Sequence, residues 1–333
     1  MGATGPAPVL GPGGGCFRRP RRVGTLPRPA RWPGGGPSVK IAIVGAGILG
    51  TSLGVLAKRA GHEVVAVASR TLKSAREAAK TIGGVTVVGD AGLSALGADL
   101  VLLSVPDRAI PSVAIQVAAG GALRRGAVVA HLSGALPAGV LAGVHAAGGW
   151  VGSMHPLQTF ADVETAIASL AGSFFFLEGD PDALDVLRSF VLSMEGRPVP
   201  LTAAGKALYH AAACVASNYL VTLADFATTL MQRAGVPADA ALDALLPLVK
   251  GTVRNLEALG LPDALTGPIA RGDVGTVRSH LAAMHREPGD LSRLYAALAR
   301  KTVEVALRKG KIDRRTADEL LAVLAGEDAP PGA

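Results

Sequence analysis

The feature that most constrains this chain is a glycine-rich hexapeptide placed between two short apolar runs. Residues 39–44 (VKIAIV) form a β-branched run typical of a buried parallel strand. They lead directly into Gly45-Ala46-Gly47-Ile48-Leu49-Gly50 and a helix-compatible segment, after which residues 61–68 predict a second strand. A GxGxxG pattern between a strand and a helix is the fingerprint of a dinucleotide-binding βαβ unit, so we expect the whole hexapeptide to contact a cofactor.

The three glycines of this hexapeptide have different physical roles. Gly45 permits the tight turn, Gly47 lets the backbone come close to a pyrophosphate, and Gly50 allows the helix to pack closely on the strand. The helix N-terminus adds free N–H groups and the positive end of a dipole, which together favour a bound phosphate.

The residues after the second strand indicate which dinucleotide binds. Enzymes specific for NAD carry an Asp or Glu here for the ribose 2′-hydroxyl, whereas this chain has Ser69, Arg70 and Thr71. A carboxylate would repel a 2′-phosphate, and an arginine fork with two hydroxyls would bind it. The sequence therefore predicts NADP(H) as the cofactor. The alternative is that Arg70 only caps a surface strand.

Short apolar runs continue along the N-terminal half and alternate with helix-compatible segments. They predict further strands at 85–88, 100–105, 127–132, 150–154 and 173–177. From residue 201 onward the pattern is almost wholly helical. We therefore expect an α/β fold, a Rossmann-type doubly wound parallel sheet, followed by an all-α C-terminal domain.

Polar residues follow several of these strands. Ligands of doubly wound sheets bind at the carboxyl ends of the strands, so we expect Val105, Pro106 and Ser133 to contact the cofactor. His155 follows the next strand and is a candidate catalytic residue beside the nicotinamide. The alternative for His155 is a histidine that only orders its loop.

A stripe of polar side chains marks the start of the helical half. Residues 202–234 have a capping threonine and no proline, which predicts one long helix. Lys206, His210, Cys214 and Asn218 recur at steps of four and share one face of this helix, where Tyr209 and Ser217 join them. The face is either solvated or lines a cleft, and its narrowness favours the cleft. Lys206 and His210 are candidate acids for carbonyl reduction.

The net charge of +7 does not indicate a nucleic-acid partner. Residues 1–40 hold seven basic residues and no acid, so the rest of the chain carries 26 basic and 26 acidic residues. Seven Phe, three Tyr and two Trp also leave little surface for base stacking. We expect a small-molecule substrate instead of a nucleic acid.

Two cysteines in 333 residues cannot form a disulfide framework or a cysteine-rich metal site. This usage is typical of a reducing compartment, so we expect a cytoplasmic protein without a bound metal.

Two features could indicate a membrane span. The mean hydropathy is +0.38, and the segments 126–160 and 207–224 lack Asp, Glu, Lys and Arg. Histidine, proline and glycine interrupt the first segment, and Tyr209, His210, Ser217 and Asn218 interrupt the second. We expect no membrane span, and we interpret 207–224 as a helix buried inside a soluble protein.

These patterns divide the chain into four parts. Residues 1–38 are rich in Gly, Pro and Arg and are predicted to be disordered, with a transit peptide or a misassigned start as alternatives. Residues 39–200 are predicted to form the NADP-binding domain and 201–326 a helical domain for substrate binding and dimerisation. Residues 327–333 are predicted to be disordered.

Taken together, the motifs resemble a family of uncharacterised oxidoreductases that join a Rossmann-like domain to a helical domain of unknown function, number 2520. The matching segments are 45–50, 105–107, 131–134, 154–160, 209–212 with 218, and 265–268 with 271–273. The family is similar to pyrroline-carboxylate reductases, ketopantoate reductases and 6-phosphogluconate-type dehydrogenases. The resemblance implies a homodimer that reduces a small keto acid with NADPH between its two domains.

The resemblance also implies roles for particular residues. In related dehydrogenases a lysine at the position of Lys206 is the acid and an asparagine farther along the helix, here Asn218, fixes the substrate. His210 departs from those families, which often have an asparagine there. Ketopantoate is the substrate that the resemblance favours. Activity like that of prephenate dehydrogenase, in which His155 would bind the substrate hydroxyl, imine reduction, and NADPH binding without catalysis are the alternatives.

Overall fold

The computed structural model describes residues 38–95 and 97–326. The expected tail lies outside this range except for Ser38, as does the segment 327–333. The chain forms two compact units, of which the first extends to Ala213 and the second begins at Cys214. This division falls inside a helix, about a dozen residues beyond the domain boundary that the sequence predicts.

The first unit is built on an eight-stranded sheet with the order β3-β2-β1-β4-β5-β6-β7-β8. The strands are β1 (Lys40–Val44), β2 (Glu63–Ala68), β3 (Thr86–Val88), β4 (Leu100–Leu103), β5 (Val128–His131), β6 (Trp150–Pro156), β7 (Phe174–Gly179) and β8 (Arg197–Pro200). All neighbouring strands are parallel except β6 and β7, which are antiparallel. The order of the first six strands is that of the Rossmann fold, which confirms the predicted fold class.

β8 is a strand that the sequence analysis did not predict. It contains Pro198 and Pro200, which remove two ladder donors. The strand is tolerated because it lies at the edge of the sheet and pairs on one side with β7.

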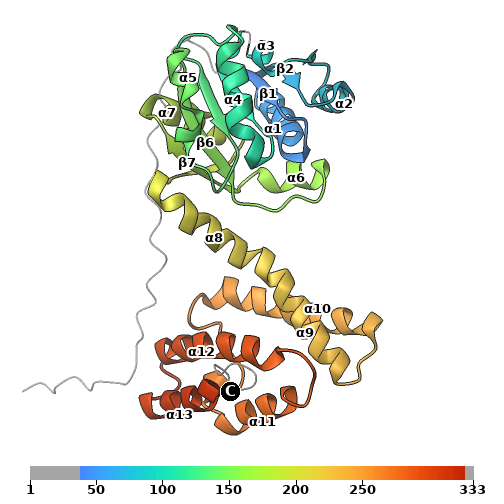
Figure 1. Ribbon diagram of the computed structural model, residues 1–333, viewed down its shortest axis with the longest axis vertical. Coiled ribbons are helices and arrows are strands. Elements are labelled where there is room, and N and C mark those ends of the chain that lie inside the picture. Colours follow the sequence, from blue (N-terminus) through green and yellow to red (C-terminus); the bar gives the residue numbers. More distant parts are fainter. Residues whose placement is uncertain (1–37, 96, 327–333) are drawn as a thin grey trace, which may run out of the picture. The chain divides into compact units, whose positions relative to one another are not determined.

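Helices cover both faces of the sheet (Figure 1). The helices and 3₁₀ turns of this unit are α1 (Ile48–Arg59), α2 (Leu72–Ile82), α3 (Ala91–Ser94), η1 (Asp107–Ala109), α4 (Ile110–Ala119), η2 (Ala138–Leu141), α5 (Gly143–Ala146), α6 (Val163–Leu170), α7 (Pro181–Ser193) and η3 (Ala203–Gly205). One buried cluster joins the sheet to α1, α2, α6 and α7, and a second joins it to α3, α4 and α5. Successive residues of β1 alternate between the two clusters, as Ile43 and Val44 illustrate.

A buried histidine fixes the start of β1. His62 Nδ1 accepts a hydrogen bond from Val39 N at 3.1 Å, and its Nε2 donates to Ser193 Oγ at 2.7 Å. Ser193 Oγ in turn donates to Phe190 O. The ring therefore ties the amino end of the central strand to the end of α7.

The second unit contains helices throughout its described length. The helices are the end of α8 (Lys206–Ala216), then α9 (Asn218–Arg233), α10 (Ala238–Leu259), η4 (Ile269–Arg271), α11 (Val274–Met284), α12 (Leu291–Lys309) and α13 (Arg314–Ala325). α9 packs against α10, whereas η4 and α11 to α13 share a separate core that includes Val277, Val303 and Leu320. This arrangement confirms the predicted all-helical C-terminal region.

The single helix predicted over residues 202–234 is wrong in detail. A 3₁₀ turn precedes α8, and Ser217 (φ −114°, ψ −70°) separates α8 from α9. Leu220 N donates to Ser217 O, a bond that spans three residues instead of four and tightens the chain at this point.

The burial expected for residues 207–224 is not found within a single copy of the chain. The stretch Ala203–Arg233 is, by length and composition, long and apolar enough to cross a membrane, and none of its most apolar 18-residue window is buried. A helix that is apolar and uncovered in one copy of the chain requires another explanation.

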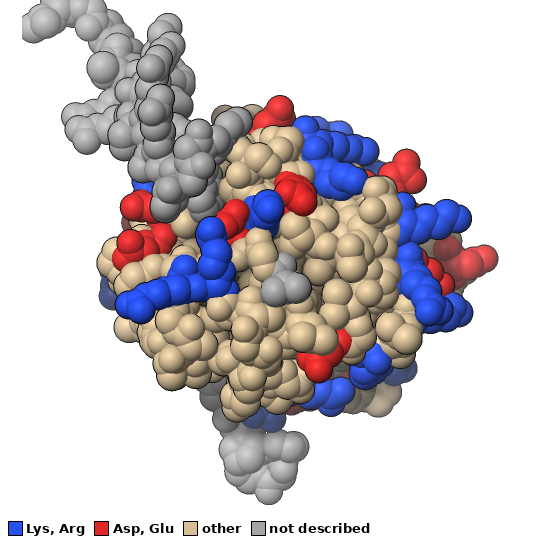
Figure 2. Space-filling model, turned by 90° about the horizontal axis from the view of Figure 1, so that it is seen from above, with Lys and Arg blue, Asp and Glu red and all other residues tan. Residues whose placement is uncertain are grey.

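Figure 2 shows basic and acidic side chains together on the face that it presents. This distribution agrees with the equal numbers of acids and bases beyond residue 40.

Buried neutral histidines should make the fold sensitive to acid. Burial lowers the pKa of His62, and it lowers the pKa of His131 to about 4. In this pH range the unfolded chain therefore binds more protons than the folded chain. The free energy of unfolding should fall as pH drops from about 6.5 to about 4. His131 alone can contribute about 3 kcal/mol of this loss.

Urea unfolding at a series of pH values measures this dependence. His62→Gln replaces the ring with a neutral amide. It should reduce the slope of the free energy of unfolding against pH between pH 6.5 and 4. Stability that stays constant over this interval would contradict the prediction. Carboxylates with lowered pKa, such as Asp273, reduce stability mainly below about pH 5, so the interval between pH 6.5 and 5 reports on the histidines.

Candidate active site

The glycine hexapeptide forms a turn that admits side chains at only one of its three glycines. Gly45 has φ +114°, and a Cβ on it would lie 2.0 Å from Ser104 O. A Cβ on Gly50 would lie 2.2 Å from Gly45 O. A Cβ on Gly47 would meet no atom within 4 Å, so its backbone faces open space. The turn is therefore closely packed at Gly45 and Gly50 and leaves the backbone of Gly47 accessible, an arrangement that lets a pyrophosphate approach the main chain.

A cavity of about 490 Å³ adjoins this turn at the carboxyl ends of β1, β2 and β4. The residues that the sequence predicts for the cofactor and that line this cavity are Gly45, Ala46, Gly47, Ser69, Arg70, Thr71, Val105 and Pro106. Four polar lining residues were missed: Ser74, Ser104, Arg108 and Gln116. Ser104 precedes the predicted cofactor residue Val105, and Arg108 follows Pro106 by two positions, so extending the cofactor prediction by one or two residues on each side would have included both.

The remaining cofactor predictions lie beside the cavity. Ile48 and Leu49 begin α1 and are not among the lining residues, and Gly50 lies beneath the Gly45 carbonyl. Ser133 instead donates from Oγ to Asp107 Oδ2 at 2.8 Å and accepts from the backbone of Ala135. Its side chain orders the loop after β5.

The far end of the cavity fits a phosphate group on the ribose. Thr71 caps α2, with Oγ1 accepting from Ser74 N at 3.2 Å, and the dipole of α2 therefore has its positive end here. The described lining residues include Arg70 and Arg108 and no carboxylate. A dianionic 2′-phosphate is the group that this combination favours.

A second cluster lies at the carboxyl ends of β5 and β6, in the same unit. Lys206, the first residue of α8, is 1% exposed, and its Nζ donates to Ser133 O at 3.0 Å and to Ser153 Oγ. Burial lowers the pKa of Lys206 to about 8, although the carboxylates of Glu178 and Asp107 act in the opposite direction. The ammonium is therefore enclosed by the strand ends and supplies a buried positive charge.

The next turn of α8 lies over His155. Tyr209 Oη is 2.6 Å from His155 Nδ1, and the His210 ring lies edge-on to the His155 ring with centroids 6.1 Å apart. Burial lowers the pKa of His155 to about 4, with further lowering by His210 and Lys206, and burial raises the pKa of Tyr209 to about 12. At neutral pH the imidazole of His155 is uncharged and the phenol of Tyr209 keeps its proton.

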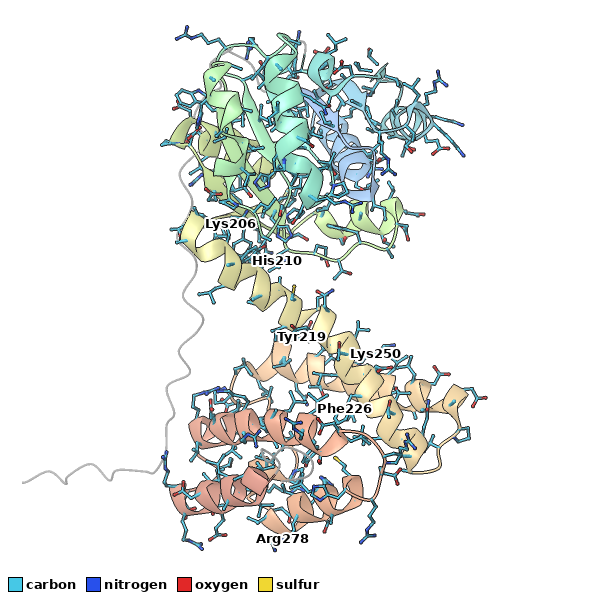
Figure 3. All side chains as sticks on the ribbon, viewed as in Figure 1. Lys206, His210, Tyr219, Phe226, Lys250 and Arg278 are labelled. Atoms are coloured by element: carbon cyan, nitrogen blue, oxygen red, sulfur yellow. The ribbon has the colours of Figure 1, made fainter. Side chains whose placement is uncertain are left out.

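The structure thus brings three of the four candidate catalytic residues together and adds a fourth group. Lys206, His210 and His155 belong to one cluster, and Tyr209 joins it (Figure 3 labels Lys206 and His210). Asn218 begins α9 in the second unit and is exposed. Among residues 38–95 and 97–326, no group of three His, Cys, Asp or Glu side chains is arranged to hold a metal ion.

Comparisons with known proteins agree with this division of the chain. A Rossmann-like family model matches residues 35–156, and the family described as Domain of unknown function (DUF2520) matches residues 173–302. The chain therefore joins a Rossmann-like domain to a DUF2520 domain. The resemblance inferred from the motifs is confirmed. No curated protein sequence matches this chain significantly.

Several solved structures are similar to this chain. A provisionally assigned NADP oxidoreductase from Bacteroides fragilis is 27% identical, with a TM-score of 0.64 over 80% of this chain and 99% of that one. Protein TM1727 from Thermotoga maritima is also 27% identical, with a TM-score of 0.65 over 81% and 99%. A reductive aminase from Aspergillus terreus, solved with NADPH and ethyl levulinate, shares the fold at 18% identity, with a TM-score of 0.55 over 85% and 98%.

Replacing Arg70 with Ala should weaken NADPH binding about 10- to 100-fold and leave NADH binding nearly unchanged, because only NADPH has a 2′-phosphate for the guanidinium to pair with. Isothermal titration with both cofactors measures the difference. Arg76→Ala removes an exposed arginine of α2 that does not line the cavity and is the matched control. Equal losses of affinity for NADPH and NADH would show that Arg70 does not recognise the 2′-phosphate.

Proposed function

We propose that this protein is an NADPH-dependent reductase of a small carbonyl compound. The observation that carries the proposal is a chain of contacts from the lining of the cavity to the Lys206 cluster. Val105 and Pro106 line the cavity, Asp107 follows them, and the Asp107 carboxylate accepts from Ser133. Ser133 O then accepts from Lys206 Nζ. A dinucleotide in the cavity would supply the hydride within reach of a polar, largely buried cluster.

Besides a hydride donor, carbonyl reduction requires a group that stabilises the charge on the carbonyl oxygen, and the residues of the cluster can supply it. Negative charge develops on the carbonyl oxygen as the hydride arrives, and a nearby cation or proton donor lowers its cost. Lys206 provides a buried positive charge, and its pKa of about 8 keeps it mostly protonated at neutral pH. We therefore propose that Lys206 stabilises the negative charge on the carbonyl oxygen.

Ketopantoate is the first substrate to test, because the family resemblance favours it. The direct experiment is NADPH oxidation with a panel of keto acids and cyclic imines, together with NADP⁺ reduction by prephenate. Turnover of ketopantoate supports the proposal. Turnover of prephenate alone would favour oxidation of a hydroxyl bound by His155, and tight NADPH binding without any turnover would favour a non-catalytic protein.

With the substrate identified in this way, Lys206→Met should reduce kcat about 100- to 1,000-fold and leave the affinity for NADPH unchanged, since the ammonium lies outside the cofactor cavity. The wild-type rate should fall as pH rises through about 8, where Lys206 loses its proton. Lys80→Ala, an exposed lysine of α2, serves as the control. Unchanged kcat in a folded Lys206→Met variant would exclude Lys206 from the reaction.

We also propose that the protein is a homodimer that pairs through α9 and α10. α9 has no buried residue, and Ala241 is the one buried residue of α10. Large apolar side chains are exposed on both helices: Tyr219, Leu220, Val221, Leu223, Leu242, Leu246, Leu248, Val253, Leu256 and Leu259. Apolar patches of this kind are typical of surfaces that a second subunit covers.

Val221→Glu combined with Leu248→Glu should therefore convert a dimer into a monomer, because each places a charge among exposed apolar residues. Sedimentation equilibrium measures the mass. Ile115→Glu alters an equally exposed apolar residue of α4 in the first unit and should leave the dimer intact. A wild-type chain that is monomeric in buffer, or that partitions into lipid vesicles through this segment, would contradict the proposal.

A further inference from the structure

Three polar side chains form a buried row across β5, β6 and β7, which we call the polar row. His131 of β5 is in register with Ser153 of β6, and Ser153 is in register with Glu178 of β7. Residues in register point to the same face of a sheet, so the three side chains are neighbours. His131 and Ser153 are fully buried, and Glu178 is 8% exposed. Groups buried to this degree need hydrogen-bond partners within the protein.

The polar row finds these partners in the loop that follows β5. Ser133 N donates to His131 Nδ1 at 3.2 Å, and His131 Nε2 donates to Pro137 O at 3.2 Å. Ala138 N donates to Glu178 Oε2 at 2.7 Å. The backbone from residue 133 to residue 138 is therefore held at three points by the side chains beneath it.

These hydrogen bonds leave the charge of Glu178 without a counter-charge inside the polar row. The ring of His131 accepts on Nδ1 and donates from Nε2, so it is neutral, in agreement with its pKa of about 4. The partner of Glu178 in the loop is a neutral amide. A buried carboxylate of this kind needs a cation nearby. Lys206 supplies one, since its Nζ donates to Ser153 Oγ, and Ser153 is the residue opposite Glu178.

The other titratable groups around the Lys206 ammonium are less suited to balance its charge. Asp107 acts on the ammonium too, but its side chain is exposed and accepts from Ser133 Oγ. The remaining groups of the cluster are His131, His155, His210 and Tyr209. None of these four can supply a negative charge at neutral pH, because three are imidazoles and burial raises the pKa of the phenol to about 12.

We propose that Glu178 is the positioning residue of the candidate active site, which keeps Lys206 charged and, through Ala138, holds the loop whose Ser133 carbonyl binds the ammonium. The inference rests on the proposed reductase function and adds the group that sets its upper pH limit. Burial lowers the pKa of Lys206 to about 8, and Glu178 is the stronger of the two carboxylates that oppose this effect. One side chain therefore acts on both partners of the bond between Lys206 and Ser133.

Glu178→Gln separates the charge of this side chain from its hydrogen bond. The amide oxygen can still accept from Ala138 N, whereas the negative charge is lost. The pKa of Lys206 should fall by about one unit, because a nearby anion favours the ammonium. Carbon-13 spectra of protein labelled at lysine Cε, with the Lys206 signal assigned through Lys206→Met, measure this pKa without substrate. Glu164→Gln removes an exposed carboxylate of α6 and is the matched control.

The same variant should move the pH dependence of the reaction. A Lys206 pKa that is one unit lower leaves about a tenth of the ammonium at pH 8, where the wild type keeps about half. With the substrate identified by NADPH oxidation, kcat of Glu178→Gln should therefore be about fivefold below that of the wild type at pH 8 and nearly equal to it at pH 6. The affinity for NADPH, measured by titration, should not change.

Glu178→Asp is the complementary variant. It keeps the charge, but its side chain is one methylene shorter, so the hydrogen bond from Ala138 N is weakened. The pKa of Lys206 should stay closer to 8 in this variant than in Glu178→Gln. A residue that only held the loop would give the reverse order, with Gln close to the wild type and Asp the more damaging change.

The outcomes separate the role of Glu178 from the reductase function. A Lys206 pKa that Gln lowers and Asp retains supports the proposal, and it does so even if no carbonyl compound is reduced, a result that would overturn only the proposed function. A Lys206 pKa that Glu178→Gln leaves unchanged overturns the role of Glu178 and leaves the reductase standing.

Asp107→Asn decides the question if Glu178→Gln does not fold. With Glu178 as the main counter-charge, the pKa of Lys206 should fall by less than about half a unit in this variant. A larger fall would assign the counter-charge to Asp107 and overturn the proposal.

Discussion

The candidate active site depends on one buried charge. The Lys206 ammonium, held by Ser133 O and Ser153 Oγ, fixes the first turn of α8 against the ends of β5 and β6. Tyr209 and His210 follow three and four residues later, so the same anchor brings both onto His155. A charge in this position is costly to bury, and the nearby carboxylates of Glu178 and Asp107 offset part of the cost. The buried lysine thus sets the geometry and lowers the proton affinity of the histidine beside it.

The cofactor half of the site could be predicted from sequence because local backbone geometry determines it. Gly45 and Gly50 are required by contacts within the turn and with the adjacent strand, and Arg70 follows a strand whose end is easily recognised. The cluster around Lys206 and His155, in contrast, depends on contacts between segments that are distant in the sequence. Lys206 and His210 were identifiable as a stripe, but the pairing of Tyr209 with His155 joins residues 54 positions apart, and no pattern in the sequence reveals it.

Two further features escaped prediction because tertiary context reverses the usual preference. Proline argues against a strand, yet β8 contains two prolines at the edge of the sheet, where one side of the strand needs no partner. Glycine usually indicates a backbone requirement, yet Gly134 is constrained by the side chains of His155 and His210. A single sequence gives no means of distinguishing a glycine needed for its φ angle from one needed for its lack of volume.

The hydrogen bonds of His62 have a practical consequence for handling the protein. They hold Val39 at the amino end of β1, whereas the glycine turn begins at the carboxyl end of the same strand. Five extended residues separate the two ends by about 16 Å. A fusion partner or surface tether joined to the chain directly before Val39 would therefore meet the sheet at the end of β1 opposite the nucleotide cavity, which makes this position suitable for immobilising the protein in binding measurements.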